Sequence, residues 1–184
     1  MELTSMLQGR MYAPARRAVI AYALESTAHL DTLYGLAYSP DDRVSLNALW
    51  CLSLLPRSVS FLTFARRDEL IDHLLAGTTT SKRRVIMQLL RGIRYDKDTL
   101  RSDLLDYCLS RINSQTELPA VRAYAIYIAY DHCRHYPELL AELASHLDLL
   151  ATQPLSPGLR AALRSTRARL SPGPKREKTN KKEH

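Results

Sequence analysis

The sequence of 184 residues predicts an all-α fold in which short helices stack as repeated pairs. Three observations predict this. Amphipathic segments bounded by helix-start and helix-stop residues follow one another along the chain, and no alternating β-branched run interrupts them. The chain has only 6 glycines, fewer than a turn-rich β fold of this length would use. Five segments also align without gaps on one apolar residue, which indicates an internal repeat.

Boundary residues place the individual helices. The segment Ser39–Asp42 combines capping residues with acids that suit the positive end of a helix dipole. Gly77 is a helix stop, and Pro119, Pro137 and Pro157 suit first turns, where a missing N–H costs nothing. The expected helices are Leu3–Gln8, Pro14–Ser26, His29–Tyr38, Asp41–Leu55, Ser60–Leu75, Ser81–Ile93, Lys97–Asn113, Pro119–Cys133, Pro137–Leu150 and Ser156–Leu170.

The repeat is defined by one apolar anchor residue in every second helix. The anchors are separated by 25, 41, 36 and 38 residues, and the last three intervals are near the period of about 40 residues typical of two-helix repeats. The short first interval suits an atypical terminal unit. Another amphipathic helix lies between successive anchors, so the repeated unit is a helical hairpin. The five anchors are Val19, Val44, Val85, Val121 and Leu159.

The segment Leu118–Ile126 has the most specific pattern. Its Pro119 and Arg122, with a valine between them, stand where the second helix of a HEAT unit begins. The chain resembles the HEAT-repeat and armadillo-like superfamily from Pro14 to Leu170, although single units lack consensus positions, such as a proline before Val85. This resemblance implies a right-handed α-α superhelix, a solenoid of about four to five helical hairpins.

The chain is expected to form one domain over residues 1–170, followed by a basic tail over 171–184. The tail has five Lys and Arg residues against two Glu, a composition that favours disorder. The last helix, Ser156–Leu170, has one apolar face and an arginine stripe beside it. We therefore interpret it as a capping helix with one side exposed to solvent.

Two sets of side chains are candidate binding residues. Equivalent positions line up along a solenoid, so residues at one offset from the anchors can form a ridge. The candidate ridge consists of Trp50, Arg91 and Tyr127 at offset six and Asn47, Gln88 and Tyr124 at offset three. The candidate basic patch consists of Lys82, Arg83, Arg84, Arg160, Arg164 and Arg167.

Both sets also have a purely structural interpretation, which stays open at this point. Aromatic residues can pack between repeats with their polar tips at the rim, and clustered cations can form a solvated face. The run Lys82–Arg84 nevertheless opens a helix, where cations oppose the dipole. That cost is a hint of an anion or an acidic partner.

No motif for catalysis or for a cofactor is found. The sequence has no glycine-rich phosphate loop and no nucleophile elbow. The densest set of possible metal ligands is Asp131–His135, where His132 and His135 share a helix face but Cys133 points elsewhere, so we expect no metal. We expect buried, reduced thiols at the three cysteines, which are Cys51, Cys108 and Cys133.

These observations predict a non-enzymatic scaffold or adaptor that binds a protein partner. We expect a cytoplasmic location, because the N-terminus does not resemble a secretory signal and the longest apolar run, Ala123–Tyr130, is too short to span a bilayer. Another possibility is a structural subunit of an oligomer. In that case the opening helix Leu3–Leu7 joins a neighbouring copy or caps the stack.

The alternative function is nucleic-acid binding. Some HEAT-like solenoids are DNA glycosylases that act on alkylated bases, and that family uses a basic groove, aromatic residues and a catalytic aspartate. Asp131 and the neighbouring tyrosines are the nearest equivalents, but no motif matches residue by residue, and the chain has a single tryptophan.

Overall fold

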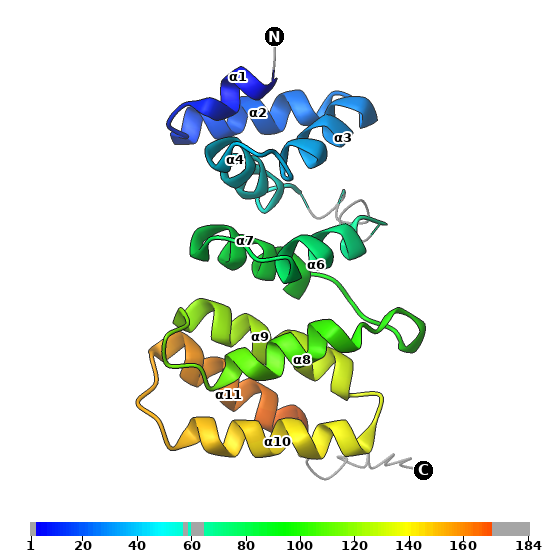
Figure 1. Cartoon of the computed structure of the whole chain (residues 1–184), viewed down its shortest axis with the longest axis vertical. Coiled ribbons are helices and arrows are strands. Elements are labelled where there is room, and N and C mark those ends of the chain that lie inside the picture. Colours follow the sequence, from blue (N-terminus) through cyan, green and yellow to red (C-terminus); the bar gives the residue numbers. More distant parts are fainter. Residues whose placement is uncertain (1–2, 57–58, 60–64, 171–184) are drawn as a thin grey trace, which may run out of the picture.

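The computed structural model describes residues 3–56, 59 and 65–170, and within them every regular element is a helix. The helices stack along the long axis of the molecule, with α1 at one end and α10 and α11 at the other (Figure 1). The elements are α1 (Leu3–Gln8), α2 (Ala13–Leu24), α3 (Thr27–Leu36), α4 (Asp42–Leu52), α6 (Arg67–Leu75), α7 (Thr80–Arg91), the 3-10 helix η2 (Lys97–Thr99), α8 (Ser102–Ile112), α9 (Pro119–Cys133), α10 (Pro137–Ala151) and α11 (Pro157–Leu170).

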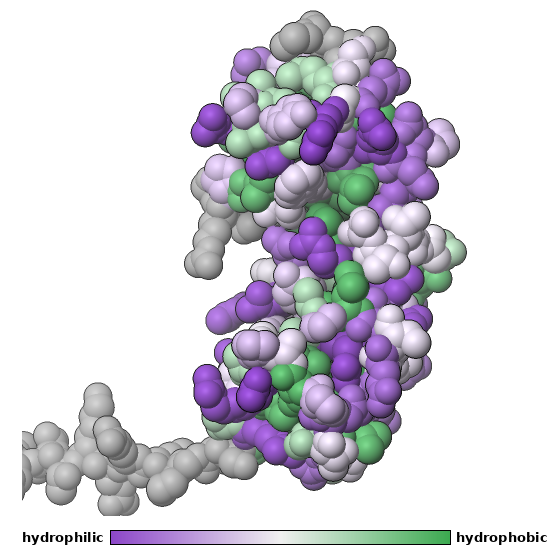
Figure 2. All heavy atoms as spheres, turned by 90° about the vertical axis from the view of Figure 1, so that its left-hand side faces the viewer, coloured by the Kyte–Doolittle hydropathy of each residue, from purple (hydrophilic) through white to green (hydrophobic). Residues whose placement is uncertain are grey.

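The helices form two layers, which confirms the predicted solenoid of paired helices. The first helices are α1, α3, α6, α8 and α10, and the second helices are α2, α4, α7, α9 and α11. Each second helix packs against the next one, and α3, α6, α8 and α10 pack against the second helix that follows them. The outline of the stack is curved in side view (Figure 2). We refer to α2, α4, α7, α9 and α11 together as the second-helix layer.

The anchors of the repeat lie in the core. All five are at most 2% exposed, and they belong to one continuous cluster of buried apolar residues. α9 is buried on several sides, because it packs against α7, α8, α10 and α11. Its sequence required such cover, since Val121 and Ile128 lie on one side and Ile126 lies on another, all at most 1% exposed.

The opening helix belongs to the stack. α1 packs mainly against α4, and its Leu3 and Leu7 side chains are 4% and 0% exposed. The amide of Asn47 on α4 donates from Nδ2 to the Leu7 carbonyl at 2.7 Å and to the Gly9 carbonyl at 3.1 Å. These bonds satisfy carbonyl groups that the end of a helix leaves without partners. Within the chain, α1 therefore caps the stack, which is one of the two roles considered for it.

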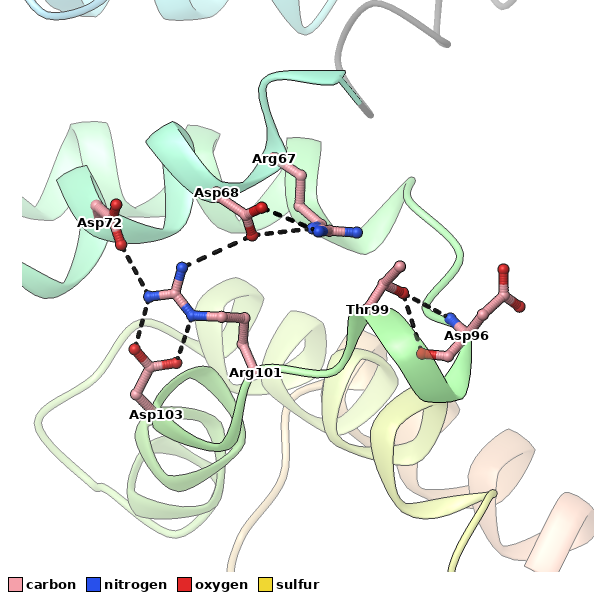
Figure 3. A network of polar contacts seen from close by, with 7 residues as sticks. All are labelled: Arg67, Asp68, Asp72, Asp96, Thr99, Arg101 and Asp103. Atoms are coloured by element: carbon pink, nitrogen blue, oxygen red, sulfur yellow. Dashed lines mark hydrogen bonds and ion pairs between the residues drawn. The ribbon is translucent and has the colours of Figure 1, made fainter.

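The expected helix Lys97–Asn113 is wrong in one respect, because it is interrupted. A 3-10 turn over Lys97–Thr99 comes first, the chain is extended at Leu100, and α8 begins at Ser102. The Thr99 hydroxyl accepts from the Asp96 N–H at 2.9 Å and lies 3.0 Å from the Asp96 carbonyl (Figure 3). This local bonding closes the turn and competes with a continuous helix.

Of two other expectations, one lies partly and the other wholly outside the described residues. Of the expected helix Ser60–Leu75, residues 60–64 are not described, and α6 begins at Arg67. The basic tail over 171–184 is also outside the described residues. The remaining helices are present, with ends that differ from the expected ones by a few residues.

The interruption before α8 places Arg101 where it joins two first helices. Its guanidinium donates to both carboxylate oxygens of Asp103 at 2.9 and 2.6 Å and to Asp72 on α6 at 2.8 Å (Figure 3). Asp68 lies 3.6 Å away and is also bonded by Arg67. Hydrogen bonds from Arg101 lower the pKa of Asp103, and those from Arg67, with a smaller effect of Arg101, lower the pKa of Asp68.

This ion-pair network predicts a pH-dependent contribution to stability. Because the pKa values of Asp68 and Asp103 lie below their ordinary value of 3.8, the contribution is present above that value and is lost as pH falls through the lower, folded-state values. Replacing Arg101 by Met is expected to destabilise the chain by up to about 1 kcal/mol near pH 6, because the groups are partly exposed. Urea unfolding near pH 6 and near pH 3 measures this, and a difference from wild type that persists undiminished at the lower pH would contradict it.

A second prediction concerns the packing of the second helices. Leu90 on α7 is 0% exposed, and α7 packs against both α4 and α9. Leu90→Ala is expected to reduce the free energy of unfolding by about 2–5 kcal/mol, since it leaves a cavity between pairs. The control Leu149→Ala changes a side chain that is 56% exposed, and its effect should stay within about 0.5 kcal/mol. Equal losses in urea unfolding would show that the second helices are not the core of the stack.

Candidate interaction surface

The two layers of helices carry opposite charge. The second helices contain twelve Lys and Arg residues against two Asp. The first helices contain nine Asp and Glu residues against two Arg. The chain's modest net charge of +7 therefore conceals a strong separation between its layers. Such a separation gives the second-helix layer a positive potential that attracts acidic partners.

Arginine side chains of the second-helix layer lie over aromatic rings of the neighbouring second helix. A guanidinium over a ring is attracted by the ring's electron-rich face and retains donors for a carboxylate. Measured from the guanidinium carbon to the ring centroid, the pairs are Arg16–Trp50 at 4.3 Å, Arg91–Tyr127 at 4.5 Å, Arg91–Tyr124 at 5.7 Å and Arg169–Tyr130 at 5.6 Å.

Two depressions adjoin these pairs. The first, which we call the Trp50 depression, has a volume of about 630 Å³ and lies between residues 9–13, α2 and α4. The second, which we call the Tyr127 depression, has a volume of about 370 Å³ and lies between α7, α9 and α11. Both open on the second-helix layer, so both are candidate contact points for a partner.

The offset-six residues of the candidate ridge are divided between the two depressions. Trp50 is 36% exposed and lines the first depression. Arg91 and Tyr127 come together in the second, where Ser165 donates from Oγ to the Tyr127 hydroxyl at 3.4 Å. Ser165 also lies six residues after its anchor, Leu159, so the repeat register itself was the signal for this residue.

The offset-three residues do not share one environment. Asn47 is 7% exposed, and its amide is committed to holding the end of α1. Gln88 is half-buried on α7, whereas Tyr124 on α9 is half-buried beneath Arg91. Of the three, Tyr124 has a direct contact with the arginine–aromatic pairs.

The candidate basic patch divides between α7 and α11. At the start of α7, Lys82 is 6% exposed and its Nζ pairs with Asp42 Oδ1 at 2.6 Å. Arg83 pairs with Glu117 at 2.5 Å, and the Glu117 side chain is 2% exposed. These carboxylates come from the preceding and following hairpins and offset the cost of cations at a helix start. The unusual charge at this terminus therefore has an internal explanation.

On α11 the arginines of the patch have mixed surroundings. Arg160 donates to the Leu155 carbonyl at 3.3 Å. Arg167 donates to the Leu147 carbonyl and forms an ion pair with Asp148 on α10. Arg164 is exposed, and Arg84 at the start of α7 is half-buried. The patch is thus not one continuous cationic surface.

The sequence interpretation missed Arg10, Arg16 and Arg169. Arg10 and Arg16 line the Trp50 depression with Arg43, and Arg169 lines the Tyr127 depression with Asp131. For Arg169 a signal was present, because it stands ten residues after its anchor, as Asp131 does after Val121. For Arg10 there was none, since it precedes the first aligned segment.

The segment Asp131–His135 serves packing. His132 is 1% exposed, its Nδ1 lies 2.9 Å from the Ile128 carbonyl, and burial lowers its pKa. His135 Nε2 lies 3.0 Å from the Tyr95 carbonyl, and Asp131 pairs with Arg134 at 3.8 Å. Among the described residues, no group of three or more His, Cys, Asp or Glu side chains is arranged to hold a metal ion.

The three cysteines are free and buried. Burial raises the thiol pKa of Cys51 to about 11 and of Cys133 to about 12, and it raises that of Cys108 further. The thiols are therefore protonated and poorly reactive at neutral pH. Within the part of the chain that the structure describes, no helix has the length and apolar character needed to cross a bilayer.

Comparison with known protein families gives a match. A family model described as a HEAT repeat domain matches residues 3–170, the range over which the paired helices are found. No curated protein and no solved structure matches the chain.

The ion pairs of the basic patch predict unequal effects of two similar substitutions. Arg83→Met leaves the buried Glu117 carboxylate without its cation, so we expect a loss of roughly 2 kcal/mol or more in the free energy of unfolding. Lys82→Met leaves Asp42, whose side chain is 74% exposed and can be solvated, so the loss should be below about 1 kcal/mol.

Urea unfolding of both variants measures this difference. Adding Glu117→Gln to Arg83→Met should restore part of the stability, because it removes the stranded charge. Two variants that lose equal stability would contradict the assignment of Arg83 as a joint between hairpins.

Proposed function

The chain belongs to the HEAT-repeat family, and on this premise we propose that it is a non-enzymatic scaffold that binds a protein partner through its second-helix layer. Proteins built from HEAT repeats are generally scaffolds for protein interaction, since the stacked helices offer an extended surface of equivalent side chains. Fold alone does not specify a function, so the proposal rests on the side chains of this surface.

The separation of charge between the layers is the observation that carries the proposal. Twelve cations against two acids on the second helices create a field that attracts and orients an acidic segment. Several cations of the chain, including Lys82, Arg83 and Arg101, are already paired internally. Arg16 and Arg91 instead lie over aromatic rings in the two depressions, where an incoming carboxylate can reach them.

The arrangement of the aromatic rings favours a protein over a nucleic acid. Proteins that bind single strands stack bases on the faces of aromatic side chains. Here Arg16 lies over one face of Trp50 and Arg91 over one face of Tyr127, so a base that stacked on that face would have to displace a guanidinium. A carboxylate needs only the N–H edge of that guanidinium. The nucleic-acid alternative is supported by the positive charge of the second-helix layer but not by the arrangement of its aromatic rings.

We further propose a cytoplasmic location. Cys51, Cys108 and Cys133 are free and buried, as expected in a reducing compartment.

The test is affinity capture from the native host, with the full chain as bait and quantitative mass spectrometry as the readout. Wild type should capture defined proteins, and Arg91→Glu combined with Arg169→Glu should reduce their recovery by roughly tenfold, because both arginines that line the Tyr127 depression are replaced by acids. Arg164→Glu is the matched control, since it lies exposed on the same helix as Arg169 but outside the depression.

Two outcomes would contradict the proposal. Undiminished capture by the double variant would exclude the second-helix layer around Tyr127 as the binding surface. The other outcome is that nuclease treatment abolishes the recovery of captured proteins and that retention of the chain on DNA falls steeply with added salt. Together these two results would show that the partner is a nucleic acid and not a protein. Circular dichroism of each variant confirms that the helices are intact.

A further inference from the structure

The Trp50 depression is lined by three arginines and by no acidic residue. Arg10 precedes α2, Arg16 lies on α2 and Arg43 lies on α4. Over residues 3–56, 59 and 65–170, none of the three is within ion-pair distance of a carboxylate. Their charge is therefore not neutralised by the described part of the chain, in contrast to that of Lys82 or Arg101.

One of these arginines is held in place before any partner binds, and a second lies near an aromatic ring. Arg16 donates from Nη1 to the Met11 carbonyl at 2.8 Å, and its guanidinium carbon lies 4.3 Å from the centre of the Trp50 ring. Arg10 lies 5.3 Å from the centre of the Tyr12 ring. Side chains that are already ordered lose less conformational entropy on binding, which increases affinity.

The depression also offers apolar surface next to these charges. Tyr12 is 59% exposed and Trp50 is 36% exposed, and Leu46 and Met11 contribute to the lining. Asn47 fixes the base of the depression through its bonds to the carbonyl groups of α1 and Gly9. Large aromatic side chains left exposed beside arginines are typical of the anchoring points of protein interfaces.

We infer that the Trp50 depression anchors an extended acidic segment of a protein partner, with an apolar side chain of that segment seated beside Trp50. This inference rests on the proposed function and names the site that holds the partner. Arg10 comes from the connection between α1 and α2, Arg16 from α2 and Arg43 from α4, and this spread suits carboxylates spaced along a peptide. A volume of about 630 Å³ is within the range of roughly 300–1,000 Å³ that ligand sites occupy.

An acidic peptide fits these features better than a phosphate group or a base does. The depression is lined by a single glycine, Gly9, whereas phosphate sites commonly use a glycine-rich loop. A single phosphate would also leave the exposed rings of Tyr12 and Trp50 uncovered. One face of Trp50 already carries Arg16, so base stacking there requires displacement of that arginine.

Trp50 is the single tryptophan of the chain, so its fluorescence reports on this depression alone. The probe is a synthetic dodecapeptide of glutamates around a central leucine, titrated into the full chain at low salt. A saturable change in Trp50 emission is expected. The matched peptide with glutamine in place of glutamate, and the matched peptide with glycine in place of leucine, should bind at least several-fold more weakly.

Variants of the arginines locate the binding energy. Arg16→Glu combined with Arg43→Glu should weaken binding roughly tenfold or more, and Arg43→Gln alone should weaken it measurably. Arg17→Glu is the matched control, because Arg17 is exposed on α2 and does not line the depression. When the titration is repeated at about 0.15 M salt, which screens the general field, Arg17→Glu should change affinity by no more than about twofold. If the double variant fails to fold, Arg43→Gln, at an exposed residue, keeps the measurement decisive.

Three results would overturn the inference. They are the absence of any Trp50 response to the acidic peptide, an equal loss with Arg17→Glu, and tighter binding of a phosphopeptide or a single-stranded oligonucleotide of the same charge. Arg91→Glu with Arg169→Glu should leave the Trp50 response intact. The capture experiment with that double variant tests the second-helix layer around Tyr127, and the peptide titration tests the Trp50 depression. Failure of the proposed function can therefore be told apart from failure of this anchor.

Discussion

The packing of each second helix between its neighbours is the constraint on which the rest of the structure depends. α9 shows it most clearly, because it carries apolar side chains on several sides and packs against α7, α8, α10 and α11. A single hairpin cannot bury such a helix, so the chain has to continue as a stack. The ends then need separate solutions. Asn47 holds α1 over α4 at one end, and α11 turns an arginine-bearing side to solvent at the other.

Polar contacts between hairpins fix how the pairs sit on one another. Arg122 is 7% exposed and donates to the Ile112 carbonyl at 2.9 Å and to Gln153 at 2.7 Å. Arg134 similarly donates to the Tyr95 carbonyl at 2.9 Å. Burial lowers the pKa of Arg122, and the two acceptors offset part of this cost by bonding its Nε and Nη2 groups. Such contacts use much of the chain's positive charge for architecture.

The distinction between paired and available arginines determines where a partner can bind. Arginines that sit between hairpins have carboxylate or carbonyl partners within the chain, as Arg83 and Arg122 do. Arg16 and Arg91 in the two depressions lie over aromatic rings, and although Arg16 also donates to the Met11 carbonyl, neither forms an ion pair with a carboxylate of the described residues. The separation of acids to the first helices and cations to the second makes one layer attractive to an acidic segment. Composition alone shows a net charge of +7 and conceals this arrangement.

The sequence by itself determined the helices, their pairing and the buried anchor in each second helix, because these depend on local periodicity and capping chemistry. It also supplied the register that relates Trp50, Arg91, Tyr127 and Ser165. Only the tertiary structure decided which of these side chains meet, and it assigned Asn47 and Lys82 to internal contacts. The reason is physical: an interaction between side chains some 40 residues apart depends on the stacking of whole hairpins, which no local pattern specifies.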